Sequence, residues 1–167
     1  MFSGNGGEVK ITIDGRISRV PDFLIVGAPR CGTTALYQYL CSHPGVFMPA
    51  EKEPMFLAGY PKTLKTYLFD GTDTFHWMTT ELDEYAALFE PARENQITGE
   101  SSTWYLSHHE TVIPFIQNIY GEQADQLSII IILRNPAERI WSHWNLQRGS
   151  GREPLSFESA IQSDTIR

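Results

Sequence analysis

Arg30 stands inside a glycine loop whose residue types suit the binding of an anion. The loop runs from Gly27 to Gly32 and is followed directly by Thr33 and Thr34. Arginine offers a planar fork of N–H donors that matches phosphate or sulfate oxygens. An ATP-binding loop of this kind would carry lysine where Thr33 stands. The loop is therefore a defective ATP loop, a complete loop for another anion, or a plain turn with a solvent-facing arginine.

A second cationic position follows the apolar segment "LSIIIILRN" at 127–135. Enzymes that use ATP or GTP commonly place an aspartate after such a strand, where it holds Mg²⁺. Here the segment ends in Arg134, which repels a metal ion and attracts an anion. Ser142 lies eight residues further along and could converge with Arg134 on one phosphate. The residues favour a ligand with two separate phosphates and no metal ion.

Apolar strands alternate with amphipathic helices in the segments that must position these residues. This alternation predicts an α/β fold with a parallel sheet, in the three-layer α/β/α arrangement of P-loop-like proteins. Only three parallel strands are predicted, so we expect the chain to be truncated at its C-terminus. The expected strands are 22–27, 96–101 and 127–135, and the expected helices are 33–43, 80–89, 109–121, 136–149 and one more from 152.

Residues 9–20 alternate apolar and polar side chains on either side of Asp14-Gly15. This pattern predicts a β-hairpin, because Asp-Gly favours a two-residue turn. We expect an edge hairpin without chemistry, belonging to an N-terminal extension over 1–20. A single domain is then predicted over 21–167.

Composition excludes several functions. The net charge of −7 argues against nucleic-acid binding, and the apolar runs are too short for a membrane segment. The N-terminus lacks the basic and apolar regions of a secretory signal. Cys31 and Cys41 suggest reduced thiols, so we expect a cytoplasmic protein. The sequence does not indicate an oligomeric state.

Together, the two motifs resemble sulfotransferases that use 3′-phosphoadenosine 5′-phosphosulfate (PAPS). "VGAPRCGTTALYQYL" is similar to the 5′-phosphosulfate loop of that family, and "IILRNPAERIWSHW" is similar to its 3′-phosphate segment. "HPGVFMPAEKEPMFL" resembles bacterial members and the heparan-sulfate and tyrosyl-protein branches. "GESSTWYL" and "GREPLSFESAI" also fit bacterial members. The resemblance covers about residues 21–161, the N-terminal part of such a domain.

The resemblance implies roles for both motifs in holding the nucleotide. Arg30 would stabilise charge on the sulfuryl group and on the leaving phosphate. Arg134 and Ser142 would bind the 3′-phosphate. The backbone and hydroxyls of the loop would hold the 5′-phosphate, through Cys31, Gly32, Thr33 and Thr34.

The resemblance also points to a catalytic base. Glu53 matches a catalytic glutamate of the heparan-sulfate and tyrosyl-protein branches, and a carboxylate there could take the acceptor's proton. The alternative is a surface charge beside Lys52. His108 and His109 are weaker candidates, for which capping or surface roles are favoured. Ser101 stands where the heparan-sulfate branch often has lysine, which argues against that branch.

The predicted function is sulfuryl transfer from PAPS to a hydroxyl or amine of a small-molecule or saccharide acceptor. Residues 54–79, which are rich in aromatic side chains, are expected to help line the acceptor pocket. One alternative is a P-loop kinase or another ATP- or GTP-dependent enzyme. Another is a fragment that binds PAPS without catalysis.

Overall fold

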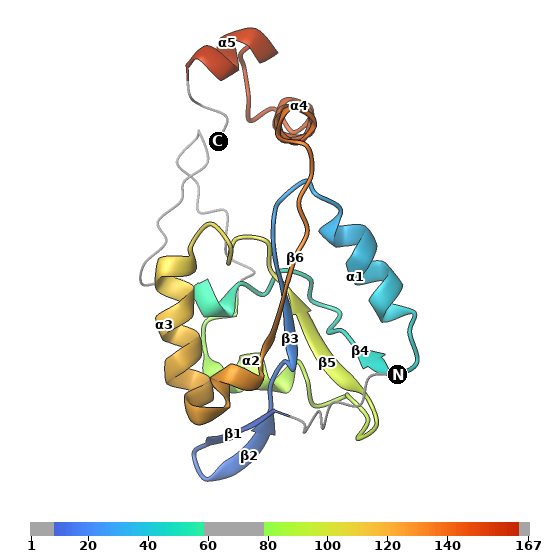
Figure 1. Cartoon of the computed structure of the whole chain (residues 1–167), viewed down its shortest axis with the longest axis vertical. Helices are drawn as coiled ribbons and strands as arrows, with labels where there is room; N and C mark the ends of the chain where they lie inside the picture. Colours follow the sequence, from blue (N-terminus) through green and yellow to red (C-terminus); the bar gives the residue numbers. More distant parts are fainter. Residues whose placement is uncertain (1–8, 59–78, 164–167) are drawn as a thin grey trace.

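The computed structural model describes residues 9–58 and 79–163. Four parallel strands form the main sheet in the order β4-β5-β3-β6 (Figure 1). The strands are β3 (Phe23–Gly27), β4 (Val46–Phe47), β5 (Ile97–Ser101) and β6 (Ser128–Ile131). The strand order is not the order along the chain, so the connections cross over the sheet, as they do in α/β folds. The predicted α/β class is confirmed.

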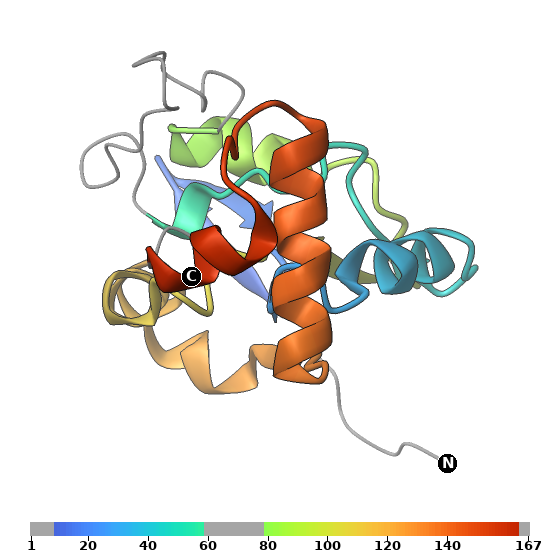
Figure 2. The same cartoon turned by 90° about the horizontal axis from the view of Figure 1, so that it is seen from above.

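Helices cover both faces of the sheet, which gives the predicted three layers (Figures 1 and 2). Helix α1 (Thr33–Cys41) lies on one face, and α3 (His109–Tyr120) lies on the other beside the 3₁₀ turn η1 (Phe56–Ala58). All five residues of β3 are buried, because the strand is covered on both faces and both edges. Its alternate side chains divide between two clusters, with Ile25 on the α1 side and Leu24 on the α3 side.

The remaining helices frame the sheet. They are α2 (Leu82–Ala87), the 3₁₀ segment η2 (Gly121–Gln126), α4 (Pro136–Gly149) and α5 (Phe157–Gln162). Helix α4 follows β6 and lies beyond the upper end of the sheet, with α5 above it (Figure 1). Within the described ranges, no helix has the length and apolar character needed to cross a bilayer.

The predicted hairpin is present as β1 (Lys10–Ile13) and β2 (Arg16–Arg19). Asp14 and Gly15 both have positive φ, at 47° and 80°, as a type I′ turn requires. The expected position at a sheet edge is wrong, because the two strands form a separate sheet. Val9 and Val20 at the base of the hairpin are buried in a cluster with Tyr120 of α3. The domain boundary after residue 20 stays a prediction.

Two local features were not foreseen from the sequence: which side of α1 faces the sheet, and the presence of β4. Tyr39 shares a helical spacing with Leu36 and Leu40 in the sequence, but it is 75% exposed in α1, and Tyr37 packs toward the sheet instead. The side of α1 that faces the sheet therefore carries Leu36, Tyr37 and Leu40. Strand β4, with two residues, is too short for its alternation to be recognised in the sequence.

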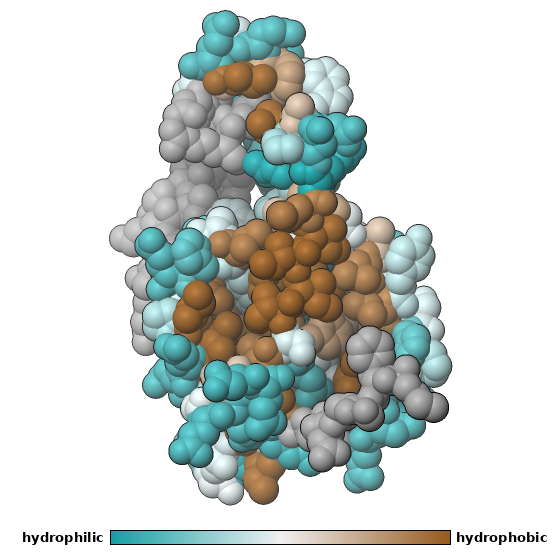
Figure 3. All heavy atoms as spheres, viewed as in Figure 1, coloured by the Kyte–Doolittle hydropathy of each residue, from teal (hydrophilic) through white to brown (hydrophobic). Residues whose placement is uncertain are grey.

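Strand β6 differs most from expectation. The sequence predicts a strand over 127–135, but the strand covers Ser128–Ile131. It is an edge strand with half of Ile129 and Ile131 exposed, and the following Leu133 is 74% exposed. These side chains belong to a hydrophobic surface over β6 (Figure 3). A run of isoleucines predicts a strand, but it does not reveal which neighbours cover it.

Candidate active site

The site is built where β3, β5 and β6 end, at the carboxyl edge of the main sheet. In open parallel sheets this edge is where ligands bind. The segments after β3 and β6 lie side by side, because Ala28 N donates to Ile132 O and Ile132 N donates to Gly27 O, both at 2.8 Å. The segment after β5 joins them, since Ser102 N donates to Ile25 O at 3.1 Å. Three stretches far apart in the sequence therefore meet here.

The glycine loop presents the start of α1 to this edge. Gly32 caps the helix with φ 101°, a conformation that other residues rarely adopt. The first N–H groups of a helix have no partner within it, and they carry partial positive charge. No acidic residue occupies the first turn of α1 to neutralise that charge. The loop therefore has the features of an anion site at a helix N-terminus.

The predicted loop residues differ in what they can offer. Cys31 N donates to Ala28 O at 3.2 Å, so this N–H closes the turn of the loop. Thr33 is 4% exposed, whereas Thr34 is exposed at the start of the helix. Cys31 and Cys41 are both free thiols; the cytoplasmic location stays a prediction.

Arg30 and Ser142 are brought into direct contact. Arg30 Nε donates to Ser142 Oγ at 3.1 Å, across 112 residues of sequence. Arg30 has φ 67° and is exposed, so its remaining N–H groups are accessible to solvent. Helix α4 thus meets the glycine loop, and the two motifs recognised separately in the sequence lie in contact.

Arg134 lies just after β6 and is paired with a carboxylate. Its Nε is 2.9 Å from Glu138 Oε2, four residues further along, and both side chains are largely exposed. Between them Asn135 caps α4, accepting from Ala137 N at 3.0 Å and from Glu138 N at 3.4 Å. The sequence prediction missed Glu138, although an i, i+4 pair of opposite charges is visible in the sequence. An anion that binds Arg134 must compete with this carboxylate.

Glu53 has partners on both carboxylate oxygens. Lys52 Nζ lies 2.6 Å from Oε1, and Thr103 Oγ1 donates to Oε2 at 3.2 Å. Glu53 N donates to Ser101 O at 3.0 Å, which ties the residue to the end of β5. The side chain keeps 25% of its surface exposed. Glu53 therefore lies at the carboxyl end of β5, held by Lys52, Thr103 and Ser101, with part of its side chain accessible.

Glu100 is a buried carboxyl group that sequence reasoning did not assign. Its Oε2 accepts from Tyr85 Oη at 2.7 Å and from Tyr105 Oη at 2.9 Å. Burial raises the pKa of Glu100 to about 7, while hydrogen bonds from Ser102 and the two tyrosines lower it and the charge of Glu53 raises it. The only sequence signal was a position near a strand tip, because the tyrosines that surround Glu100 come from other segments.

The other candidates have structural roles. His108 Nδ1 lies 3.0 Å from Trp104 O, and His109 Nδ1 lies 3.2 Å from Leu106 O, at the start of α3. Phe56, expected near an acceptor pocket, is 3% exposed and stacks on Tyr85 with 4.4 Å between ring centroids. The rest of that pocket prediction, from residue 59 to 78, lies outside the described residues. Within the described part of the chain, no group of three or more His, Cys, Asp and Glu residues could hold a metal ion.

Comparison with known proteins agrees with this architecture. Residues 21–166 match the model of the sulfotransferase family. A sulfotransferase from Alicyclobacillus acidocaldarius, solved by crystallography, is similar with a TM-score of 0.72 and 31% identity, covering 85% of this chain. The membrane-associated sulfotransferase kil1 of Dictyostelium discoideum is 26% identical over 92% of this chain. Human bifunctional heparan sulfate N-deacetylase/N-sulfotransferase 3 is 29% identical over 84% of it.

The matches concern only part of each relative. The chain spans 56% of the solved bacterial chain, 30% of kil1 and 14% of the human protein. Its glycine loop, parallel sheet and second anion motif all fall within the matched region. The chain belongs to the sulfotransferase family.

Proposed function

We propose that this chain binds PAPS and transfers its sulfuryl group to a hydroxyl or amine of an acceptor. The observation that carries the proposal is the contact between Arg30 and Ser142. It joins a loop suited to one anion with a helix that begins beside a second cation, Arg134. A nucleotide with separate 5′ and 3′ phosphates matches two neighbouring cationic positions better than a linear triphosphate does.

The loop and helix α4 would divide the nucleotide between them. The free N–H groups at the start of α1 and the exposed hydroxyl of Thr34 would hold the 5′-phosphate, with Thr33 and Gly32 shaping the turn. Arg134 would exchange Glu138 for the 3′-phosphate, and Ser142 would donate its hydroxyl there. Binding of the 5′-phosphate and binding of the 3′-phosphate would both use groups that already lie at the carboxyl edge of the sheet.

Chemistry at the site would rest on Arg30 and Glu53. PAPS supplies a sulfuryl group on a good leaving phosphate. The guanidinium of Arg30 would stabilise the negative charge that grows on the sulfuryl and phosphate oxygens. Glu53 would accept the proton of the acceptor hydroxyl or amine. The bond to Lys52 keeps this carboxylate oriented, and its exposed surface leaves it open to an acceptor.

The acceptor class is proposed from the relatives. A heparan sulfate N-sulfotransferase is among them, so we propose a saccharide acceptor. N-deacetylated heparan sulfate is a suitable first probe, tested together with small hydroxyl and amine acceptors.

Calorimetry tests the nucleotide part of the proposal. Adenosine 3′,5′-bisphosphate is expected to bind at least tenfold more tightly than ATP with Mg²⁺. Arg134→Ala and Ser142→Ala are each expected to weaken its binding. Arg16→Ala is the matched control, because Arg16 is an exposed arginine on the separate hairpin. Tighter binding of ATP–Mg²⁺ would favour the kinase-like alternative instead.

Transfer from PAPS to the acceptor panel tests the catalytic part. Tight binding of the bisphosphate without transfer to any acceptor would support the second alternative, a PAPS-binding unit without activity of its own.

A further inference from the structure

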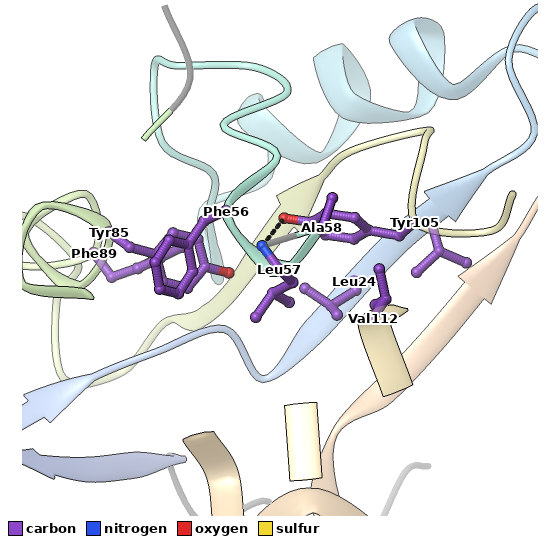
Figure 4. Packing of buried hydrophobic residues seen from close by; sticks show 9 residues of the cluster. Leu24, Phe56, Leu57, Ala58, Tyr85, Phe89, Tyr105 and Val112 are labelled. Carbon is purple, nitrogen blue, oxygen red and sulfur yellow. Dashed lines mark hydrogen bonds between the residues drawn. The ribbon is translucent and has the colours of Figure 1, made fainter. Parts of the chain in front are cut away.

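The segment that carries Glu53 is held against the end of β5 by its own backbone. Three N–H groups of residues 53–57 donate to residues at the end of this strand or just after it. They are Glu53 N to Ser101 O at 3.0 Å, Met55 N to Ser102 Oγ at 3.1 Å and Leu57 N to Tyr105 Oη at 3.1 Å. Figure 4 shows the last of these bonds, which lies within the buried cluster. The position of Glu53 therefore depends on residues of another part of the chain.

This segment has an unfavourable backbone. Glu53 and Met55 adopt positive φ values of 63° and 55°, although neither is glycine. Side chains with a Cβ atom rarely adopt this conformation, and it persists only where surrounding contacts enforce it. The three N–H bonds are such contacts, since each closes on a fixed partner at the end of β5.

One of these partners, Tyr105, is also bonded to Glu100. Tyr105 donates its hydroxyl proton to Glu100 Oε2 at 2.9 Å. A tyrosine hydroxyl has one proton, so once it points at Glu100 a lone pair remains for Leu57 N. Glu100 and Tyr105 are 0% and 1% exposed, so water does not substitute for either. Tyr85 also donates to Oε2, but no described bond links its hydroxyl to the segment of Glu53.

We propose that Glu100 is a positioning residue that acts through Tyr105 to hold the Glu53 segment at the carboxyl edge. The link runs from Glu100 Oε2 to Tyr105 Oη, then to Leu57 N and back along the backbone to Glu53. The hydrogen bonds themselves are independent of catalysis; the consequence for transfer rests on the function proposed above.

Two tyrosine variants distinguish an effect on the position of the Glu53 segment from an effect on the stability of the whole fold. Tyr105→Phe and Tyr85→Phe each remove one hydroxyl bonded to Glu100 Oε2, and both rings are fully buried. Of these two hydroxyls, that of Tyr105 accepts from Leu57 N. Amide hydrogen exchange of Leu57, relative to that of Leu24 in β3, should become at least tenfold faster in Tyr105→Phe. It should change less than threefold in Tyr85→Phe. Equal effects of the two variants would overturn the proposal.

Variants of Glu100 test whether its acceptor oxygen is what matters. Glu100→Gln keeps an oxygen that accepts from both tyrosines, so Leu57 should stay protected. Glu100→Met has a similar length without a carbonyl oxygen, so the protection of Leu57 should be lost. If Glu100→Met preserves that protection, Glu100 does not orient Tyr105 and the proposal is wrong.

Transfer assays connect the positioning to Glu53. Tyr105→Phe should lower kcat about tenfold and leave the affinity for adenosine 3′,5′-bisphosphate unchanged, because it does not touch the nucleotide motifs. Tyr85→Phe should leave both values near those of the unsubstituted chain. An unchanged kcat in Tyr105→Phe would contradict the consequence for Glu53. If the unsubstituted chain transfers nothing, the proposed function fails while the amide exchange still decides the role of Glu100.

Discussion

Arg30 links the two anion motifs, because it belongs to the glycine loop and bonds to Ser142 of α4. Each motif alone can be explained without a ligand. The glycine loop can be a simple turn, and the second motif can be an arginine that follows a strand. Their contact is what makes a binding site the better interpretation. Glu138 is also part of this charge pattern, because it is paired with Arg134. The predictions at the scale of residues concern Arg30, the proposed base Glu53, and the carboxylate of Glu138 that is paired with Arg134.

Arg30→Ala should lower the rate of sulfuryl transfer by about 10² to 10³, the usual effect of losing one preorganised charge contact. Arg30→Lys should lose less, because it keeps the charge without the planar fork. The measurement is kcat with PAPS and a responding acceptor.

Glu53→Gln should lower kcat by a similar factor, because glutamine cannot act as the base. Near-normal rates in both alanine and glutamine variants would exclude these roles.

Glu138→Gln should strengthen the binding of adenosine 3′,5′-bisphosphate. An exposed pair such as Arg134–Glu138 contributes about 0.2–1 kcal/mol, so the expected gain is about 1.4-fold to 5-fold. Calorimetry at low salt measures it. Glu158→Gln is the control, because Glu158 is also an exposed glutamate in the first turn of a helix. An equal gain in the control would indicate a general charge effect.

At the scale of elements, the strands and their crossing points position the site. The sequence predicted β3 and β6 from their apolar runs, and it also predicted a short strand at the position of β5. It did not predict the neighbours of each strand, so it gave no sign that β6 is an edge strand with exposed isoleucines. The close approach of β5 to β3 is equally invisible in sequence. It depends on Gly99, where an added Cβ would lie 2.0 Å from the ring of Phe23.

Gly99→Ala should therefore destabilise the fold. Phe23 is 6% exposed in the core, so its ring cannot move aside freely, and overpacking of this kind costs about 1–3 kcal/mol. Denaturant unfolding monitored by circular dichroism measures the change. Gly149→Ala is the matched control, because no atom lies within 4 Å of its added Cβ and α4 contains it. A loss in Gly149→Ala as large as in Gly99→Ala would contradict this explanation.

At the scale of the whole molecule, stability should depend on the ionisation of Glu100. Its pKa is about 7 in the folded chain and near the ordinary 4.5 when unfolded. Between these values the folded state binds the proton and the unfolded state does not. The contribution is therefore fully present below about pH 4.5 and is lost as the pH rises through 7. The titratable and hydrogen-bonding groups that interact with Glu100 include Tyr85, Tyr105, Tyr120, Ser102 and Glu53.

The expected loss in free energy of unfolding between pH 4.5 and 8 is about 3 kcal/mol from this group, at about 1.4 kcal/mol per pKa unit. Glu100→Gln should remove that part of the pH dependence, because it cannot ionise. Denaturant titrations of both chains at pH 5 and 8 measure the difference. Equal pH dependence in the two chains would show that Glu100 does not titrate in this window.

The sequence by itself determined the alternation of strands and helices, the glycine loop, the hairpin turn and the residues of both candidate anion motifs. These are local features, set by apolar periodicity, by the φ values that glycine allows and by the chemistry of a few side chains. Only the tertiary structure decided which residues meet: Arg30 with Ser142, Tyr105 with Leu57, and Glu100 with two tyrosines. The physical reason is that these contacts depend on strand order and on burial. Side chains far apart in the sequence lie in contact only after the sheet is assembled, and burial then changes the ionisation of Glu100.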